Sequence, residues 1–587
     1  MSRLDPDYTV TLVQSLDDAL DLKRWMGERR AGSALGIDTE TTGVNLGRDR
    51  IRLCQFGDLA HGWVVPWEDW RGLVKDVLED YDRPLVAHNV AFDYPVLKRA
   101  GVTLREELLD DTMVMAHLVN PVGRIGLKPL AAKYVGAEAM MGKDNLTDTF
   151  RSGGWDWATI PIDHPDFWIY SALDTSLTVG IYEELWPIVR DNYRRVYEVE
   201  MGAIFVLADA RIRGIAVDMD YVLTKRAELQ SEMERLRQKI PCNPSKDREV
   251  RDMLEELGDR GPLGSWWPYR TENGEVSVDK DALTAFEYAF PEVIPPLRQW
   301  RQDSKIVGTY LNNIVKEEVD GVIRCSIQPV AAKTGRMSIT GPALQTLPRG
   351  AIVRDAFVAR PGHKLVLADY QAAELRGLAY FANCVPMIEA FKRGEDLHAW
   401  VAANVYGVDV SQVNKTQRAI AKGVQFGVLY GAGTAKVALT AGVSLDDAQN
   451  FMEKYAQLFP EVKQFQNTMM ELMHTRQRED GEMYVKTLLG RRLVVDQDKP
   501  YSAVNYLIQS SMTSDLLKLK LCEMDAAGLG EFIRLPVHDE IVSEVPDDQI
   551  DDVLSTIRDV MPEHSLLGDC PIEIETDVVS SWGEHYR

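Results

Sequence analysis

The stretch LVLADYQAAELR, residues 365–376, predicts a short buried strand that ends on Asp369 and is followed by a helix. Farther along the chain, the apolar runs FIRLPV and IVSEV flank the turn His538-Asp539-Glu540, which is the pattern of a hairpin. Two predicted strand ends therefore present aspartates.

A second pair of acidic residues lies near the N-terminal end of the chain. In IDTETTG, residues 37–43, Asp38 and Glu40 stand two residues apart at the end of an apolar strand. Because side chains in a strand alternate with a period of two, both carboxylates point to the same side. Such a short motif also fits a surface strand end or a turn, so it needs support from other segments.

That support comes from two helical segments farther on. Asp93 lies near the start of a predicted helix in AHNVAFDYPVL, just after an apolar strand. Tyr170 and Asp174 are four residues apart, so they share one face of a helix. Each is unremarkable alone, and the hypothesis of a site depends on all of them together.

The segment QRAIAKGVQFGVLYG, residues 417–431, predicts a helix with an unusual stripe. Arg418, Lys422, Phe426 and Tyr430 stand at every fourth residue and drift by about 40° per step around a helix of 3.6 residues per turn. An ordinary amphipathic helix with two solvated cations and two core aromatic rings has the same pattern. The two interpretations differ in where the aromatic rings lie.

The bulk composition is that of a globular protein without membrane spans. A chain of 587 residues predicts roughly three or four domains, and no apolar run approaches the roughly 18 residues that cross a bilayer. The first residues resemble neither a signal peptide nor a transit peptide. The six cysteines form no CxxC pair, which argues against a zinc site and a disulfide framework. We expect a reducing, cytoplasmic setting.

The net charge of −24 argues, taken alone, against a protein that binds nucleic acid. Three stretches nevertheless contain no acidic residue: 330–353, 411–428 and 485–494. Local potential decides where a polyanion docks. Any one of these stretches also fits a solvated basic face.

Composition and periodicity divide the chain into two parts. Strand-like runs alternate with turns between residues 34 and 88, and helical patterns continue through Asp174, which predicts one domain with a mixed sheet. A boundary is expected near residue 190. Beyond it, Leu229, Met233, Leu236 and Ile240 form the stripe of an amphipathic helix.

The three N-terminal segments, in this order, resemble the DEDD exonuclease superfamily, in the subclass with a tyrosine in the third motif. The resemblance covers roughly residues 30 to 185. It implies that Asp38, Glu40, Asp93 and Asp174 bind two Mg²⁺ ions and that Tyr170 orients the attacking water. Mg²⁺ prefers oxygen ligands, and two such ions can stabilise both the attacking and the leaving oxygen of a phosphodiester.

The C-terminal segments resemble the motifs of family A DNA polymerases. Residues 365–376 resemble motif A, 417–431 motif B, and LPVHDEIVSEV motif C. Gln371 and Ala372 depart from the family, which commonly has Ser and often Gln there. The resemblance implies that Asp369 and Asp539 hold two Mg²⁺ ions, for which Mn²⁺ can substitute, and that Glu374 fills the space of a 2′-hydroxyl.

The resemblance assigns three sets of residues. Catalysis falls to Asp369, Asp539 and Lys422 in the polymerase part, and to Asp38, Glu40, Asp93, Tyr170 and Asp174 in the nuclease part. Deoxynucleotide binding falls to Arg418, Lys422, Phe426, Tyr430, Glu374, Gln371 and His398. DNA binding falls to Arg336, Gln345, Arg491, Asn505, Gln509 and His538.

The expected fold is α/β and multidomain: a ribonuclease H-like exonuclease domain followed by a right-hand polymerase with thumb, palm and fingers. The expected limits are 1–190 for the exonuclease domain and 191–587 for the polymerase domain. Within the latter they are about 191–318 for the thumb, 319–380 and 485–587 for the palm, and 381–484 for the fingers.

The same resemblance implies primer-template DNA and deoxynucleoside triphosphates as ligands, and replisome proteins such as a helicase and a single-strand-binding protein as partners. The length resembles that of a monomeric bacteriophage replicative polymerase, because the 37 residues before Asp38 leave no room for a 5′ nuclease. Residues 243–280 are too few for the thumb insertion that recruits thioredoxin in some phage relatives, so thioredoxin is not expected.

Three alternatives remain open from the sequence. The polymerase part could be a platform that holds DNA for the nuclease, although Asp369, Lys422 and Asp539 argue against it. The chain could be a non-catalytic DNA-binding or clamp-like subunit. It could also be a repair polymerase without proofreading, which the complete set of exonuclease residues disfavours.

Overall fold

The computed structural model describes residues 5, 7–29, 32–136, 141–260, 270, 271, 273–287, 290–348, 350–563 and 566–587. The chain forms two compact units. Unit 1 comprises residues 1–213, 327–338 and 366–578, and unit 2 comprises residues 214–326, 339–365 and 579–587.

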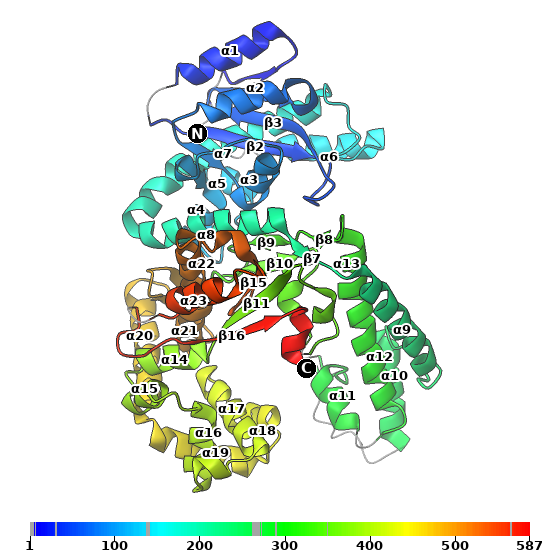
Figure 1. Ribbon diagram of the computed structural model, residues 1–587, viewed down its shortest axis with the longest axis vertical. Helices are drawn as coiled ribbons and strands as arrows, with labels where there is room; N and C mark the ends of the chain where they lie inside the picture. The colour runs from blue at the N-terminus through cyan, green and yellow to red at the C-terminus, as the bar shows by residue number, and fades with distance from the viewer. Residues whose placement is uncertain are drawn as a thin grey trace. The chain divides into compact units, whose positions relative to one another are not determined.

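Unit 1 contains a six-stranded mixed sheet near the N-terminus (Figure 1). Its strands, in spatial order, are β1 (Thr9–Leu12), β4 (His61–Pro66), β3 (Ile51–Gly57), β2 (Leu35–Thr41), β5 (Leu85–Ala87) and β6 (Leu109–Asp111). β2, β3 and β4 pair antiparallel, whereas β1, β5 and β6 pair parallel with their neighbours. The predicted mixed sheet is confirmed.

Helices cover this sheet. They are α1 (Leu16–Gly27), α2 (Trp67–Glu79), α3 (Val90–Arg99), α4 (Thr112–Val119), α5 (Leu127–Tyr134), α6 (Met141–Gly153), α7 (Pro165–Asn192) and α8 (Arg194–Arg213). α7 packs against β2, β3 and β4. α1 begins with a capping box, in which Ser15 and Asp18 satisfy each other's backbone N–H groups.

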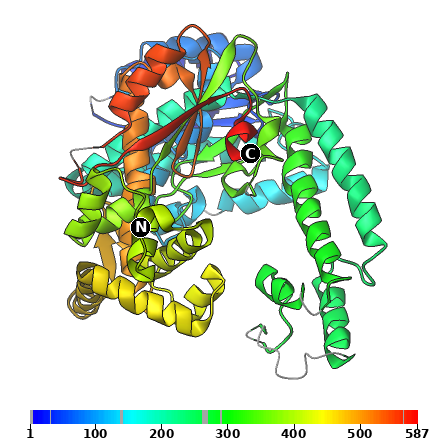
Figure 2. The same ribbon diagram turned by 60° about the horizontal axis from the view of Figure 1, so that its bottom comes forward.

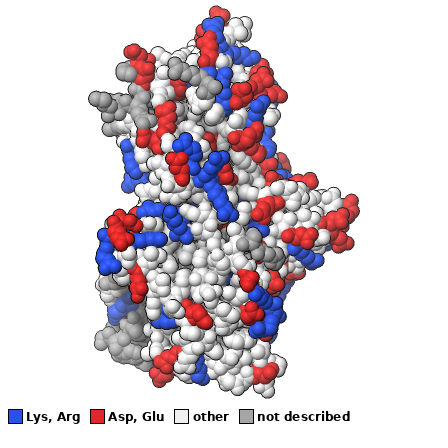
Figure 3. Space-filling model, turned by 90° about the vertical axis from the view of Figure 1, so that its left-hand side faces the viewer, with Lys and Arg blue, Asp and Glu red and all other residues white. Residues whose placement is uncertain are grey.

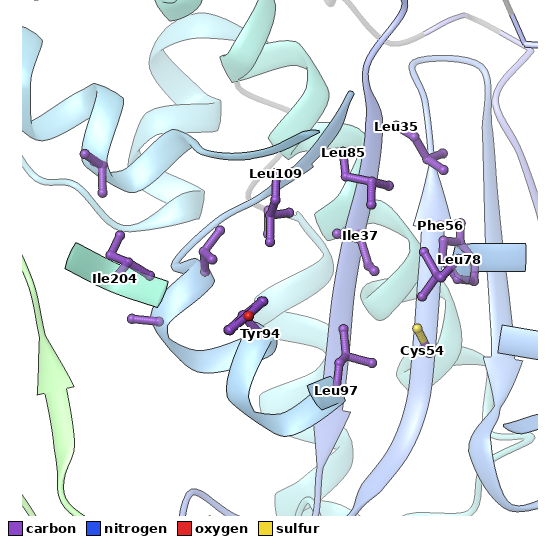
Figure 4. Close-up of a cluster of buried hydrophobic side chains, with 14 of the residues drawn as sticks. Leu35, Ile37, Cys54, Phe56, Leu78, Leu85, Tyr94, Leu97, Leu109 and Ile204 are labelled. Atoms are coloured by element: carbon purple, nitrogen blue, oxygen red, sulfur yellow. The ribbon is translucent and has the colours of Figure 1, made fainter. Parts of the chain in front are cut away.

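The core between sheet and helices consists of aliphatic and aromatic side chains from segments far apart in sequence. Figure 4 shows Leu35 and Ile37 near Cys54 and Phe56 of the neighbouring strand, with Tyr94 and Leu97 of α3 close by. The cluster extends to Ile204 of α8 and to Val330 and Leu489 of the later segments. α8 therefore packs on α3 while it leads into the second half of the chain.

The second sheet has four strands in the order β14, β15, β11, β16. They are β14 (Ile533–Val537), β15 (Glu540–Pro546), β11 (His363–Tyr370) and β16 (Ile574–Val579). Figure 2 shows the green strand β11 beside red and orange strands from the end of the chain. The predicted strand before Asp369 and the predicted hairpin around Asp539 are both confirmed.

Helices between β11 and β14 complete unit 1. They are α14 (Ala373–Phe381), α15 (Val385–Lys392), α16 (Leu397–Tyr406), α17 (Lys415–Leu429), α18 (Thr434–Ala441), α19 (Leu445–Leu458), α20 (Pro460–Glu479), α21 (Ser502–Ser510) and α22 (Leu516–Ala526). The short strands β12 (Tyr484–Lys486) and β13 (Arg492–Val494) form a hairpin between α20 and α21, and α23 (Ile550–Val560) follows β15. Asn414 and Gln417 form a capping box that fixes where α17 begins.

Unit 2 is built from helices and short strands. Its elements are β7 (Ile215–Ala216), α9 (Met219–Arg237), α10 (Asp247–Arg260), α11 (Lys280–Glu287), α12 (Ile294–Lys305), α13 (Asn312–Glu317) and β8 (Val322–Ile323). The short strands β9 (Ser326–Gln328) and β10 (Ser338–Thr340) pair where the chain passes between the units. The predicted amphipathic helix is α9, but it ends at Arg237, so including Ile240 in that helix was wrong. Ile240 instead joins the buried cluster of α10, α11 and α12.

Figure 3 shows Lys and Arg side chains beside Asp and Glu side chains on one face of the molecule. The net charge of −24 is therefore not spread as a uniformly acidic surface. Within the described residues, none of the helices is both long and apolar enough to cross a membrane.

Close approach of α7 to β2 depends on a glycine, which gives a first prediction. A Cβ at Gly36 would lie 2.3 Å from the carbonyl oxygen of Thr175 in α7. Because that oxygen belongs to the backbone, Gly36→Ala must push helix and strand apart. We expect a loss of about 1 to 3 kcal/mol in the free energy of unfolding, measured in urea.

Gly72→Ala is the matched control, because Gly72 lies in α2 with nothing within 4 Å of its added Cβ. That substitution should stabilise the protein by about 0.5 to 1 kcal/mol through helix propensity. Equal stability of the two variants would contradict the packing of α7 on β2.

His117 of α4 gives a prediction about pH. Its Nε2 lies 2.9 Å from the carbonyl oxygen of Ala332, and its Nδ1 is buried without a partner among the described residues. Burial lowers the pKa of His117 to about 4. The folded protein therefore holds fewer protons than the unfolded chain between pH 6.5 and 4, so stability falls as pH falls through this window.

We expect the wild type to lose about 2 to 3 kcal/mol more than His117→Gln between pH 6.5 and 4, because the glutamine amide does not titrate. Urea unfolding of both proteins across this range measures the difference. Parallel pH profiles would show that His117 is not buried in its neutral form.

Candidate functional site

The structure brings the five predicted nuclease residues onto neighbouring elements. β2 carries Asp38 and Glu40, α3 carries Asp93, and α7 carries Tyr170 and Asp174. The backbone N–H and the hydroxyl of Thr39 donate to Oδ1 of Asp93 at 3.1 and 2.6 Å, which holds α3 against β2. The hydroxyl of Ser171 donates to Glu40 at 3.1 Å and joins α7 to the same strand.

Burial and mutual repulsion keep these carboxylates from ionising easily. Burial raises the pKa of Asp38 well above its ordinary value, and Asp93 and Glu40 raise it further. Burial, with the charge of Asp174, raises the pKa of Glu40 to about 8. Burial also raises the pKa of Asp93 to about 7, against the hydrogen bonds from Thr39. A cation bound among these carboxylates would therefore favour their ionised form and lower their pKa values.

One cation that the sequence analysis did not single out lies in this cluster. The ammonium of Lys128, from α5, donates to Oδ1 of Asp174 and lies 4.3 Å from the centre of the Tyr170 ring. Burial and Asp174 raise the pKa of the Tyr170 hydroxyl. The phenol therefore stays protonated and can donate a hydrogen bond.

The second sheet brings Asp369 and Asp539 together. Asp369 lies near the end of β11. Asp539 lies in the turn between β14 and β15, and β15 is the strand next to β11 in the sheet. Burial raises the pKa of Asp369 to about 8, and the charge of Asp539 is the next cause. Burial also raises the pKa of Asp539. These two carboxylates therefore share a confined, acidic position.

α17 presents its predicted stripe to solvent rather than to the core. Arg418 and Lys422 are exposed, Phe426 is partly buried, and the Tyr430 side chain, just after the helix ends, is 38% exposed. The rings of Phe426 and Tyr430 stack with centroids 6.0 Å apart. The alternative of two core aromatic rings is therefore excluded, because neither ring is enclosed.

His398, from α16, lies beside this stripe. Its ring centroid is 6.1 Å from that of Phe426, and its Nδ1 contacts the side-chain oxygen of the buried Gln425. Asp396, which the sequence analysis missed, caps α16 and accepts a hydrogen bond of 2.5 Å from Nε of Arg418. Asp396 thus ties α16 to α17.

Glu374 is the centre of a hydrogen-bonded network. Tyr430 donates to its Oε2 at 2.6 Å, while Arg336 and the amide of Gln509 donate to its Oε1 at 3.1 and 3.4 Å. Arg336 also donates to the hydroxyl of Thr513 at 2.9 Å. Residues predicted for nucleotide binding and for DNA binding therefore meet at one carboxylate.

The remaining residues predicted to contact DNA or a nucleotide lie in several different elements. Asn505 lies in α21 with Gln509, His538 is exposed in the turn before Asp539 with φ of 59°, and Gln345 belongs to unit 2. Gln371 is occupied by a hydrogen bond of 3.1 Å to Glu575 of β16. Ala372 has φ of 51° and turns the chain from β11 into α14.

Arg491 is a correction. The sequence analysis predicted that it binds DNA, but its side chain is 1% exposed and is paired with Asp515 and Glu200. A buried guanidinium that already has two carboxylate partners offers no surface to a nucleic acid. The neighbouring Arg492 is only partly buried and pairs with Glu482.

Both carboxylate clusters have the chemistry of magnesium ligands, since Mg²⁺ takes oxygen donors. With the side chains as they stand in the described part of the chain, however, three or more His, Cys, Asp or Glu groups do not converge on a common point that could hold a metal ion. The carboxylate oxygens are of the type that Mg²⁺ prefers, but these side chains would have to change conformation before they could coordinate one ion together.

Comparison with known protein families matches most of the chain. The model described as DNA polymerase family A matches residues 220–584, and the model described as 3′-5′ exonuclease matches residues 13–190. The exonuclease match precedes the polymerase match, which is also the order of the corresponding motifs in the sequence.

Individual relatives extend this similarity. The DNA polymerase of Mycobacterium phage D29 is 31% identical over 618 residues, covering 98% of this chain and 97% of that protein. DNA polymerase I of Rhizobium leguminosarum is 28% identical, covering 97% of this chain and 61% of that protein. A solved structure, the POL domain of Pol1 from M. smegmatis in complex with DNA primer-template and dNTP, has the same fold with a TM-score of 0.80 at 24% identity, covering 98% of this chain and 99% of that one.

Proposed function

This chain belongs to the family A DNA polymerases and is a DNA-directed DNA polymerase with a 3′-5′ exonuclease domain; we propose that its two carboxylate clusters carry the two activities. The observation that carries the proposal is that Asp369 and Asp539, far apart in sequence, lie at neighbouring strands of one sheet, where burial raises the pKa of both and the charge of Asp539 raises that of Asp369 further. Neighbouring buried acids of this kind are typical of a functional site.

In the polymerase site, Asp369 and Asp539 would hold Mg²⁺, or Mn²⁺ in its place. The metal, when bound, supplies positive charge that activates the primer 3′-hydroxyl and stabilises the leaving pyrophosphate. Arg418 and Lys422, exposed on α17, bind the triphosphate oxygens of the incoming nucleotide. Phe426 and His398 pack beside that nucleotide, and Tyr430 supports the templating base. Phosphoryl transfer depends mainly on such positioning and charge compensation.

Fewer residues are proposed to contact DNA than the sequence alone suggests. Arg336 and Gln509 donate to the minor-groove acceptors of the terminal base pair, which every correct pair presents, so they test geometry without reading sequence. Asn505, Gln345 and His538 are proposed as further DNA contacts. Arg491 is left out because it is buried.

In the exonuclease site, Asp38, Glu40, Asp93 and Asp174 would hold Mg²⁺. Tyr170, whose phenol stays protonated, orients the water that attacks the terminal phosphodiester. Lys128 fixes Asp174 and lies against the Tyr170 ring, which holds both side chains in place. The site then removes nucleotides from a 3′ end.

We also propose the domain limits that the motifs imply: an exonuclease domain in 1–190, and thumb, palm and fingers in 191–587. Similarity to a phage polymerase across nearly the whole length supports a role in copying a bacteriophage genome in the cytoplasm of a bacterial host. In that setting the protein acts on primer-template DNA and dNTPs as a monomer, alongside a helicase and a single-strand-binding protein. Thioredoxin is not proposed as a partner; residues 261–269 of the segment concerned lie outside the described residues.

Extension of a primer with a mismatched 3′ end tests both sites at once. Wild type should remove the mismatch and then extend the primer. Asp369→Ala should trim the mismatch but extend at least on the order of 10³-fold more slowly, because the metal-binding charge is lost. Asp38→Ala should extend a matched primer normally and stall on the mismatched one.

The two variants serve as controls for each other, since each keeps the activity that the other loses. Absence of extension by the wild type with Mg²⁺ present would refute the polymerase assignment. Trimming that persists unchanged in Asp38→Ala would refute the exonuclease assignment.

The network at Glu374 gives a prediction about sugar selection. Glu374→Ala removes the group that fills the space of a 2′-hydroxyl, so ribonucleotide incorporation relative to deoxynucleotide should rise by on the order of 10- to 100-fold. Tyr430→Phe removes only the hydrogen bond to Oε2 and should raise the ratio less. Steady-state kcat/KM for paired ribo- and deoxynucleotides measures both, and an unchanged ratio in Glu374→Ala would contradict the assignment.

A further inference from the structure

Four charged side chains form a fully buried cluster inside unit 1, away from both carboxylate sites. Lys518 and Glu200 are 0% exposed, and Arg491 and Asp515 are 1% exposed. Glu200 comes from α8, Lys518 from α22, and Arg491 from the turn before β13. Burying four charges is costly, so such a cluster calls for a role.

The ammonium of Lys518 uses its full donor capacity. It donates to the two carboxylate oxygens of Glu200 at 2.7 and 2.9 Å, to the carbonyl of Pro329 at 2.8 Å, and to the carbonyl of Gly335 at 2.7 Å. An ammonium has three protons, so one is shared between the carboxylate oxygens. Lys518 therefore joins α8 to both ends of the segment 329–335.

Further buried groups hold the same segment. We name it, together with Arg336, the 329–336 loop. Gly335 has φ of 76°, and a Cβ there would lie 2.7 Å from the guanidinium carbon of Arg491. The hydroxyl of Ser514 donates to the Gly335 carbonyl at 2.6 Å. His117 of α4 contacts the Ala332 carbonyl in the middle of the loop. The loop is thus fixed at several points by buried groups.

The residue that follows Gly335 is Arg336. Its guanidinium reaches Thr513 at 2.9 Å and Glu374 at 3.1 Å. Because the Gly335 carbonyl belongs to the peptide bond that Arg336 completes, the hydrogen bonds from Lys518 and Ser514 fix the backbone from which that side chain extends. A shift of this peptide would move the guanidinium relative to Glu374.

We propose that Lys518, with Glu200 and Arg491, is a positioning residue for Arg336, so that discrimination between matched and mismatched primer ends depends on a buried contact with α8. The inference rests on the proposed function of Arg336 at the primer end. It assigns a role in copying accuracy to Glu200, which lies outside the polymerase motifs.

The test compares Lys518→Met with a matched control on the same helix. Lys520 is also buried, at 5% exposure, and pairs with Glu563 at 2.9 Å and Glu523 at 2.7 Å, so Lys520→Met likewise removes a buried ammonium. The 329–336 loop is not among its partners, which are Glu523, Glu563, Val560 and Pro562. Both substitutions are made in Asp38→Ala protein, so that trimming does not erase mismatches.

The readout is the ratio of kcat/KM for extending a matched primer to that for a mismatched one, with primer, template and dNTP defined. Lys518→Met should lower this ratio by about 10-fold, because Arg336 then contacts the correct pair less well. Lys520→Met should leave it within about 2-fold. An equal fall in both variants, or no fall in Lys518→Met, would overturn the proposal.

A double-mutant cycle separates positioning from a general loss of structure. If Lys518 acts through Arg336, then Lys518→Met added to Arg336→Ala should lower the ratio no further than Arg336→Ala alone. Independent, multiplying effects would overturn the proposal. Failure of the Asp38→Ala parent to extend a matched primer would instead overturn the proposed function.

Gly335→Ala provides a second variant should Lys518→Met not fold. It removes none of the four charges but displaces the loop against Arg491, since its Cβ would lie 2.7 Å from the guanidinium carbon. The ratio should again fall by about 10-fold and again not add to Arg336→Ala. A folded Gly335→Ala protein with an unchanged ratio would overturn the proposal.

Discussion

Repulsion between carboxylates confined at the ends of strands is the constraint on which the rest of this structure depends. Besides burial, Asp93, Glu40 and Asp174 raise the pKa of Asp38 at the first sheet, and Asp539 raises that of Asp369 at the second. Isolated buried charges of one sign destabilise a fold. In the proposed function, a cation and a phosphate compensate this charge.

Around each cluster, neutral or basic side chains hold the acids in place without neutralising them. Thr39 and Ser171 bind two carboxylates through hydroxyl groups, and Lys128 pairs with only one. In the polymerase part, Arg336, Gln509 and Tyr430 all donate to Glu374. Directional hydrogen bonds fix the orientation of these carboxyl groups.

Local patterns predicted a large part of this arrangement. The period of two placed Asp38 and Glu40 on one strand, β2, and the spacing of four placed Arg418 and Lys422 on one face of a helix, α17. Arg491 was misjudged because the resemblance assigned it to DNA binding and its stretch, 485–494, contains no acidic residue. Its partners, Glu200 and Asp515, lie 291 and 24 residues away along the chain. A pattern within a short stretch of sequence cannot predict such pairing.

The sequence by itself determined the chemistry: which strands end in aspartates, which helix carries the cations, and which family the motifs resemble. Each of these follows from neighbouring residues, because backbone periodicity and capping act within a few positions. Only the tertiary structure decided that Lys518 and Glu200 hold the 329–336 loop, that Lys128 meets Asp174, and that Asp396 meets Arg418. Burial and ion pairing depend on segments brought together by packing, and that information is absent from any local stretch of the chain.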